Sequence, residues 1–240
     1  MAEKRTTSDD SGEAPDTSQT TYATLRSLIV TGKLAPGSRV LETDVADRLG
    51  VSRTPARYAL NRLHREGFVR SDGAGKRSRF TVTPLTREDG RELLLVVGQL
   101  EALAAWLVAH LEDGERETVA DEMEAVNREL RAEASAEQPD PERIFTLDQS
   151  FHRLVVQRAE TERLETLHDY YKPQTDRYLR VYLTALTDRI DQSVIEHTAI
   201  IEAIRAGGPE EAEKAMRTNW RHAAHQLDDV ISAIGELGNW

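Results

Sequence analysis

Apolar positions in the first third of the chain follow two different periods. In three segments, 18–31, 44–49 and 53–66, they recur every three or four residues, as on one face of an amphipathic helix. Two later runs, 68–70 and 79–82, are short and alternate like strands. The pattern therefore predicts three helices followed by a β-hairpin.

The second and third of these segments have the arrangement of a helix-turn-helix. They are separated by a Gly-Val-Ser turn, in which Gly50 ends the first helix. Thr43 is placed to cap the start of the first helix with its side chain, and Ser52 to cap the second. Turn and caps together predict two short helices that meet at a sharp angle.

Several basic and polar residues of this region are candidates for DNA contact, and the capping residues Thr43 and Ser52 are among them. Arg53, Thr54 and Arg57 lie on the outward side of the N-terminal half of the second helix, the part that enters the major groove in such motifs. Arginine there bonds guanine O6 and N7, or a phosphate. Lys76 and Arg77 lie at the hairpin tip, where they would reach a phosphate or the minor groove as in a winged helix-turn-helix. The alternatives are solubilising charges on a surface helix and a solvated loop.

The charge of the chain is unevenly distributed. The whole chain carries a formal net charge of −11, but residues 18–85 carry +7 and residues 86–240 carry −15. Since neutralisation of phosphates by Lys and Arg supplies most non-specific DNA affinity, the basic part is where a polyanion would bind. Residues 1–17 carry −3, are polar and have no periodicity, which predicts a disordered tail.

A domain boundary is predicted near residue 84. Pro84 interrupts the strand pattern, and Thr86 can cap the helix that follows. We expect a mainly α protein, in which 18–84 form a winged helix-turn-helix DNA-binding domain and 85–240 an all-α bundle of about six helices. The six helical segments of the bundle are 87–112, 115–136, 142–159, 162–185, 188–206 and 209–236.

Composition narrows the setting in which the chain works. No segment approaches the ~20 apolar residues of a membrane span, and the first residues lack the hydrophobic stretch of a signal peptide. The chain contains no cysteine, which excludes disulfides and thiolate metal sites. We therefore expect a cytoplasmic protein with no membrane partner.

Within the predicted bundle, a few polar residues are candidate metal ligands. Asp148 and His152 are four residues apart, so both project from one helical face, a spacing suited to one metal ion. His197 is surrounded by apolar residues in its helix, where a neutral imidazole could point inward as a ligand for zinc or nickel. The alternative for each histidine is a structural role in the core or at the surface.

The N-terminal residues also resemble a known family. The run that begins at Leu25, LRSLIVTGKLAPGSRVLETDVADRLGVSRTPARYALNRLHREGFV, resembles the winged-helix domain of the GntR superfamily of bacterial transcription regulators. Its most specific features are the Gly-x-Leu-x-Pro-Gly turn and the Gly-Val-Ser-Arg-Thr-Pro-x-Arg block. The resemblance implies a homodimer on a short palindromic operator, with Arg53 and Arg57 at the positions that contact bases and phosphates. Tyr58 stands where the family usually has an acid.

The all-α segment is similar to the ligand-binding domain of the FadR subfamily, the FCD domain. DQSFHRL carries that domain's Asp-x-x-x-His motif at Asp148 and His152, and EHTAIIEAI carries the next ligand histidine at His197. The family's fourth ligand, a histidine, falls on Asn219 in AMRTNWRHA. An amide oxygen is a weaker ligand for zinc than imidazole, and His222 lies one turn further along as a possible substitute ligand. The resemblance thus implies a divalent cation in the bundle.

The resemblance also bears on the effector. Val97 stands where members of the family often have an arginine that pairs with a carboxylate ligand. The missing arginine favours a more apolar effector over a small organic acid. We expect the effector to reposition the bundle helices and shift the DNA-binding heads, so that a repressor is released from its operator.

Two other functions remain open at this point. One is a metal-dependent hydrolase or lyase in which Asp148, His152 and His197 activate water. Against it, the sequence has no Gly-x-Ser-x-Gly, phosphate-binding loop or His-Glu-x-x-His motif. The other is a DNA-binding protein that needs no effector and has a purely structural bundle.

Overall fold

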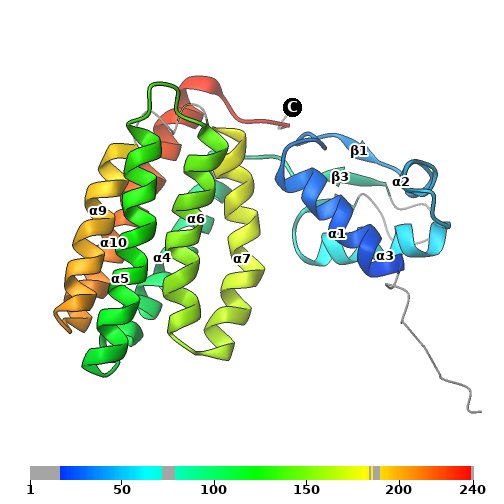
Figure 1. Cartoon of the computed structure of the whole chain (residues 1–240). Coiled ribbons are helices and arrows are strands. Elements are labelled where there is room, and N and C mark those ends of the chain that lie inside the picture. The colour runs from blue at the N-terminus through cyan, green and yellow to red at the C-terminus, as the bar shows by residue number, and fades with distance from the viewer. Residues whose placement is uncertain (1–16, 72–78, 184, 186–189, 239–240) are drawn as a thin grey trace, which may run out of the picture.

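The computed structural model describes residues 17–71, 79–183, 185 and 190–238, which form two packed units (Figure 1). The N-terminal unit consists of α1 (Thr17–Val30), β1 (Arg39–Val40), α2 (Glu42–Leu49), α3 (Arg53–Arg65), β2 (Val69–Ser71) and β3 (Phe80–Val82). The bundle consists of α4 (Arg87–Ala109), α5 (Asp113–Ala134), α6 (Pro141–Arg158), α7 (Glu162–Val181), α9 (Ile190–Arg205) and α10 (Pro209–Ile234). The predicted fold class is confirmed.

The N-terminal unit packs three helices against a small antiparallel sheet with strand order β1-β3-β2. Val40 of β1 pairs with Phe80, and Val69 of β2 pairs with Val82, so their side chains lie on the buried face. Their partners in this core are the buried apolar residues of α1 and α3, Leu25, Ile29, Ala56, Leu60 and Leu63. The sequence pattern did not predict β1, because two residues are too few to show a period.

The helix-turn-helix is present, but its first cap differs from the prediction. Gly50 ends α2 in the left-handed conformation, with φ 65°, as expected. Thr43 does not cap α2, because the helix begins two residues earlier than predicted, at Glu42, with Leu41 at the N-cap position. The hydroxyl of Thr43 donates instead to Asp44. Ser52 does occupy the N-cap position of α3, although its side chain makes no capping hydrogen bond.

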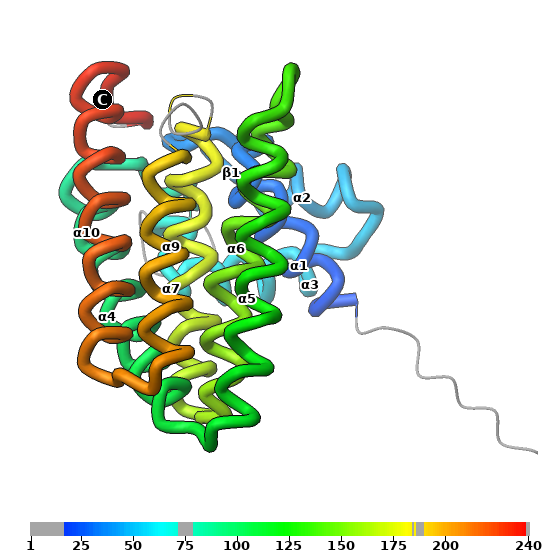
Figure 2. Tube along the Cα trace, turned by 60° about the vertical axis from the view of Figure 1, so that its left-hand side comes forward, coloured from blue at the N-terminus to red at the C-terminus, as the bar shows by residue number. Residues whose placement is uncertain are grey.

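The bundle is built around α4. Thr86 caps this helix as predicted, by accepting a hydrogen bond from the backbone N–H of Asp89. Helices α4 and α10 lie side by side along the bundle (Figure 2). Contrary to the sequence-based expectation, α4 is long and apolar enough to cross a membrane by length and composition alone. However, 56% of its apolar window is buried inside the bundle, as in the core helix of a globular protein.

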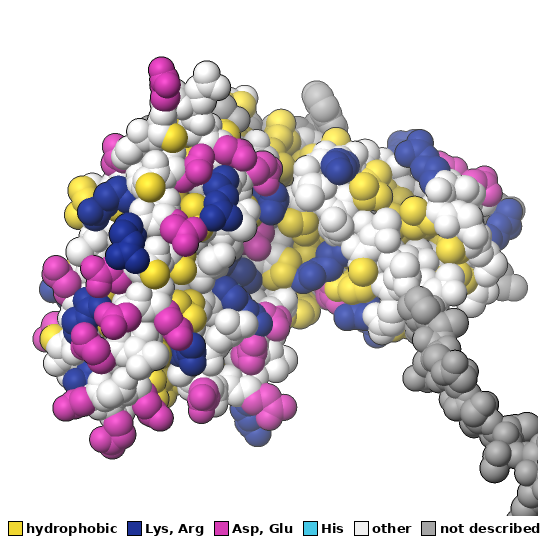
Figure 3. Space-filling view, in the orientation of Figure 1, with side chains coloured by type: hydrophobic (Ala, Val, Ile, Leu, Met, Phe, Trp, Pro, Cys, Tyr) yellow, Lys and Arg dark blue, Asp and Glu magenta, His cyan; other side chains and the backbone are white. Residues whose placement is uncertain are grey.

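The segment that follows α10 helps to join the two units. Leu237, beyond α10, exchanges two backbone hydrogen bonds with Leu85, which precedes α4. Gly238 lies so close to Gly37 that a β-carbon on Gly37 would come within 2.6 Å of the Gly238 backbone, so this crossing requires glycine. Hydrophobic side chains gather at the junction in Figure 3. The N-terminal unit is therefore held to the bundle by packing and not by a linker alone.

The packing of α4 against α10 predicts the effect of a small substitution. A β-carbon on Gly98 of α4 would lie 2.6 Å from the β-carbon of Trp220, so Gly98→Ala should destabilise the protein by about 1–3 kcal/mol. Gly114, near the start of α5, has nothing within 4 Å of an added β-carbon. Gly114→Ala is the matched control and should be neutral or stabilising by up to about 1 kcal/mol. Urea unfolding of both variants measures the difference, and equal stabilities would contradict this packing.

Candidate functional site

The first candidate site is the outer face of α3. Arg53, Thr54 and Arg57 are exposed, while Ala56 and Leu60 on the opposite side are buried in the core of the N-terminal unit. The structure thus places these three residues together on one solvent-facing surface. Lys76 and Arg77, the predicted contacts at the hairpin tip, lie outside the described residues.

Arg57 is already engaged within the N-terminal unit. Its Nε donates to Glu42 Oε1 at 2.9 Å, and its Nη2 donates to Glu42 Oε2, also at 2.9 Å. The hydrogen bonds and charge of Glu42 raise the pKa of Arg57. Because this bidentate pair uses one edge of the guanidinium, the other edge remains for an outside partner. Arg53, in contrast, has no ion pair among the described residues.

The second candidate site is a cluster of three side chains inside the bundle. Asp148 and His152 come from α6 and His197 comes from α9. Asp148 Oδ1 lies 3.6 Å from His197 Nε2 and 4.0 Å from His152 Nε2. One ligand atom from each of the three residues lies within 4.8 Å of the others. The fold therefore brings together the three residues that the sequence analysis singled out.

The contacts of His197 leave one ring nitrogen available. The amide nitrogen of Asn127 donates to Val194 O and Thr198 Oγ1, so the carbonyl oxygen of Asn127 faces His197 Nδ1 and accepts its proton at 3.2 Å. Nε2 then carries a lone pair, is buried and has no hydrogen-bond partner among the described residues.

His197 is also fixed in orientation and kept neutral. The ring of Phe151 is stacked on it, with centroids 3.7 Å apart and an interplanar angle of 8°. Burial, together with the nearby charge of His152, lowers the pKa of His197 well below its usual value. A neutral, oriented imidazole with a free lone pair is the form in which histidine binds a metal ion.

His152 is oriented by a buried carboxylate that the sequence analysis did not identify. Glu101 of α4 is fully buried, and its Oε2 accepts a hydrogen bond from His152 Nδ1 at 2.6 Å. Burial alone would lower the pKa of His152, but the charge and hydrogen bond of Glu101 raise it above its usual value. The same contact directs His152 Nε2 toward Asp148, as the carboxylate partners of metal-binding histidines do.

Glu101 has two further donors and is held as an anion by all three. Trp220 Nε1 donates to Oε2 at 2.8 Å, and His168 Nε2 donates to Oε1 at 2.9 Å. Burial alone would raise the pKa of Glu101, but His152 and His168 hold it well below its usual range. The one sequence signal for Glu101 is its position as an acid within the long apolar stretch of α4.

Asn219 and His222 lie differently from the three clustered residues. The amide nitrogen of Asn219 donates to Glu196 Oε2 at 3.0 Å, which leaves its carbonyl oxygen as its free acceptor. His222 is half exposed and donates through Nδ1 to the same carboxylate. Only Asn219 also lines the pocket beside the cluster. The structure thus brings His222 to Glu196 and not to Asp148.

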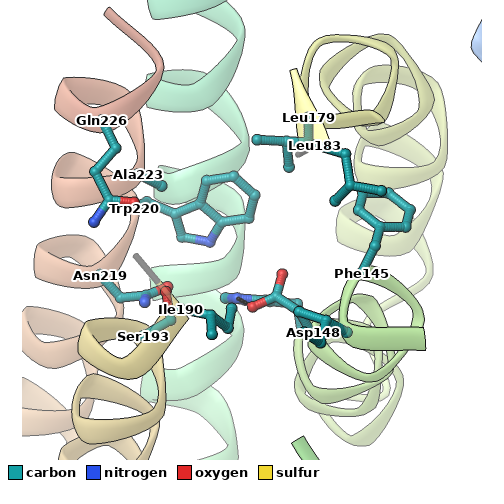
Figure 4. A pocket seen from close by; sticks show the side chains of 12 residues that line it. Phe145, Asp148, Leu179, Leu183, Ile190, Ser193, Asn219, Trp220, Ala223 and Gln226 are labelled. Carbon is teal, nitrogen blue, oxygen red and sulfur yellow. Dashed lines mark ion pairs between the residues drawn. The ribbon is translucent and has the colours of Figure 1, made fainter. Parts of the chain in front are cut away.

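A pocket opens directly beside the cluster. It encloses about 630 Å³, open solvent included, and Asp148, His152 and Asn219 contribute its polar floor. Phe145 and Asp148 of α6 face Asn219 and Trp220 of α10 across it (Figure 4). The apolar residues of its wall are Ile144, Phe145, Leu179, Leu183, Ile190, Trp220 and Ala223. Such a cavity suits a small, largely apolar molecule with one polar end.

The donor set fits a divalent cation. Two imidazoles and a carboxylate are ligands that zinc and nickel accept, with His152 releasing its Nε2 proton when a metal binds. A site with three protein ligands keeps a position open for a further ligand. Burial raises the pKa of Asp148, against the opposing pull of His152 and Lys172, so this carboxyl lacks a full counter-charge of its own. A bound cation would supply that charge and would also satisfy the free nitrogen of His197.

Comparison with known sequences matches both units of the chain. The sequence profile of the FCD domain family matches residues 92–222, more than half of the chain. The profile of the bacterial regulatory proteins of the gntR family matches residues 17–75. The first match spans the candidate cluster, and the second spans the helix-turn-helix.

Similar whole proteins are transcription regulators. YdhC of Bacillus subtilis, an uncharacterized HTH-type transcriptional regulator, is 28% identical over 88% of this chain and 90% of its own length. The probable D-xylose utilization operon transcriptional repressor of Paenarthrobacter nicotinovorans is 29% identical over 86% and 85%. Among solved structures, E. coli McbR/YncC matches with a TM-score of 0.68 and 19% identity over 89% of this chain and 98% of that one. The chain thus belongs to the FCD domain family, carries a gntR-type helix-turn-helix domain ahead of it, and is a transcription regulator, not an enzyme.

Proposed function

We propose that this regulator is a homodimeric repressor of the FadR subfamily that binds a palindromic operator in the cytoplasm and is released by a small-molecule effector. In this proposal the effector binds in the bundle pocket, next to a divalent cation held by Asp148, His152 and His197. The observation that carries the proposal is the buried Nε2 of His197, which has no hydrogen-bond partner among the described residues and lies 3.6 Å from Asp148, a residue that lines the adjoining pocket.

Each residue of the cluster has a distinct part in holding the cation. His197 offers Nε2 because Asn127 accepts its Nδ1 proton, and His152 offers Nε2 because Glu101 accepts its own. Asp148 supplies the negative charge. The cation, zinc or nickel, would provide a Lewis-acidic point to which a polar effector group can bind. Asn219 lies across the pocket, where its carbonyl oxygen is available to the effector or the cation.

The pocket walls define the effector in general terms. Val97, at the position of the family's carboxylate-binding arginine, is fully buried in the core and does not line the pocket. Two aromatic rings, those of Phe145 and Trp220, border the cavity instead. We infer an effector with an apolar body and a single cation-binding end, which supports the expectation of a more apolar ligand.

The exposed face of α4 supports the dimer. Leu95 and Leu103, eight residues apart and so on one side of the helix, are 39% and 47% exposed. Val96, between them on the same side, is half-buried and lines a shallow surface groove with Leu95 and Gln99. An apolar stripe on an otherwise acidic bundle is the kind of surface that a second copy covers in a symmetric dimer. Two copies would present two α3 helices to the two halves of a palindrome.

The DNA-reading role predicts the effect of removing one arginine. Arg53→Ala should weaken binding to a DNA fragment selected from a random library by about 1–3 kcal/mol and relax its sequence preference. Arg128→Ala, which removes an exposed arginine from α5 of the bundle, is the control and should change neither. Fluorescence anisotropy with the selected and with scrambled DNA measures both effects. Equal losses on the two DNAs for Arg53→Ala would show that the residue does not read bases.

The cation site predicts a metal content. The wild-type chain, loaded with Zn²⁺ and desalted without a histidine tag, should retain about one ion per chain, and Asp148→Asn should lose most of it because a charged ligand is gone. His222→Gln is the matched control and should keep the ion, since His222 contacts Glu196 instead of the cluster. Elemental analysis gives the ratio. Zinc retained by Asp148→Asn, or absent from the wild type, would contradict the site.

The dimer proposal predicts that a charge on the α4 stripe separates the two copies. The wild type should have roughly twice the chain mass of 27.0 kDa. Leu103→Glu should shift it toward the monomer, because the acid would have to be buried in an apolar contact. Leu167→Glu places the same change on α7, where Leu167 is 48% exposed, and should leave the dimer intact. Sedimentation equilibrium measures the masses, and a Leu103→Glu protein that stays dimeric would rule out this face.

A further inference from the structure

Helix α7 lies between the bundle interior and the N-terminal unit, and its two faces contact different partners (Figure 1). Tyr170, Gln174, Arg177 and Val181 follow one another at steps of four, three and four residues, so they form one stripe of the helix. His168, Lys172, Thr175 and Leu179 follow one another at similar steps and form the opposite stripe.

The first stripe contacts the N-terminal unit along its whole length. Tyr170 donates its hydroxyl hydrogen to the backbone oxygen of Arg65 at the end of α3, at 3.0 Å. Gln174 lies against Gly67, in the turn between α3 and β2. Arg177 donates from Nη2 to the backbone oxygen of Thr83, directly after β3. The helix that presents Arg53 and the strand that ends the hairpin are thus both held by α7.

The second stripe contacts the candidate cation site and its pocket. His168 donates from Nε2 to Glu101 at 2.9 Å, and the other oxygen of Glu101 accepts the Nδ1 proton of His152. Leu179, two turns further along, lines the pocket. One buried carboxylate therefore joins a candidate metal ligand to α7 through two direct hydrogen bonds.

The contact at Arg177 is sensitive to small movements. Its side chain is only 4% exposed, and burial lowers its pKa to about 10. Nη2 donates to Thr83, while Nε has no hydrogen-bond partner among the described residues. A buried guanidinium is costly unless its donors are satisfied, so losing the Thr83 contact would favour a different arrangement of the two units.

We propose that α7 couples the cation and effector site to the DNA-binding unit, with Glu101 as the positioning residue at the bundle end and Arg177 as the positioning residue at the DNA-binding end. This inference rests on the proposed function of the cluster. A ligand that draws His152 toward the cation changes its contact with Glu101, and Glu101 passes the change to His168 and hence to α7. Packed helices move as rigid bodies, so a shift of α7 reaches α3 and β3 together.

The first test separates the coupling between the two sites from zinc binding in the bundle and from DNA binding by the N-terminal unit. The probes are Zn²⁺ and a DNA fragment selected from a random library by the wild-type chain in EDTA. Saturating zinc should change the DNA affinity of the wild type by roughly fivefold or more. Arg177→Gln should bind zinc as the wild type does and bind DNA in EDTA within about threefold of it, but the zinc-induced change should fall below about twofold.

Two further variants serve as controls for this test. Arg180→Gln is the matched control, because Arg180 is an arginine of the same helix that pairs with Glu142 and has no hydrogen bond or ion pair with the described part of the N-terminal unit. It should keep the zinc effect. Tyr170→Phe removes a single exposed hydroxyl and should reduce the effect in part. If Arg177→Gln does not fold, Tyr170→Phe decides the question.

The second test follows the change through the bundle. Zinc should alter amide hydrogen exchange of the wild type in the segments 63–71 and 80–83, which contain Arg65, Gly67 and Thr83, the residues that contact α7. Glu101→Gln should weaken zinc binding by roughly ten- to a hundredfold, as loss of an orienting partner does. At saturating zinc, the changes in amide hydrogen exchange of the Glu101→Gln variant should be confined to the bundle. Glu115→Gln, the same substitution at an exposed position of α5, should behave as the wild type.

The outcomes distinguish this inference from the function on which it rests. A zinc effect on DNA affinity that survives in Arg177→Gln and Tyr170→Phe overturns the coupling role of α7. A wild type that binds zinc with no effect on DNA affinity also overturns it, while the cation site stands. A wild type that binds DNA but no zinc overturns both the cation site and the coupling.

Discussion

The bundle depends on the burial of one charge, the carboxylate of Glu101. Taking an ion out of water costs several kcal/mol, so a fully buried carboxylate persists only when donors surround it. Three side chains provide them, His152 from α6, His168 from α7 and Trp220 from α10. Because Glu101 itself belongs to α4, this single group ties four helices together. It also orients the pocket wall at Trp220 and the candidate ligand His152.

The same constraint connects the two units of the protein. A bundle held only by apolar packing would tolerate sliding of one helix along another, whereas directional hydrogen bonds to Glu101 set the position of each helix. On its other side, α7 holds the backbone of the N-terminal unit at Arg65 and Thr83. A basic domain for DNA and an acidic domain for a small ligand thus share one rigid element, and regulation needs no contact between DNA and ligand.

Much of this architecture was predictable from local pattern. Gly50 and Thr86 marked the end of α2 and the start of α4, because each has a backbone or capping preference that acts within a few residues. Asp148 and His152 were recognisable as a pair because helical spacing is also local. The structure adds the meeting of that pair with His197 across two helices. The cation-binding role and the DNA contacts remain predictions that the experiments above address.

What the pattern missed has physical reasons of its own. The two residues of β1 are too few to show a period, and Thr43 does not cap α2 because the helix begins two residues earlier than predicted. The role of Glu101 was hidden because its partners lie 51, 67 and 119 residues away, and no local rule links them. Long-range polar contacts in a core are set by packing and are visible only in the fold.

Coupling between the cation site and the DNA-binding unit is tested most directly by the zinc affinity of the chain. This affinity is measured for the free protein and for the protein bound to its selected DNA, by competition with a chelating dye. Coupling between two sites is reciprocal, so a cation that changes DNA binding must itself bind the two forms differently, by the same factor. We expect the zinc affinities of the free and DNA-bound protein to differ by roughly fivefold or more. Equal zinc affinities in the two forms would contradict it.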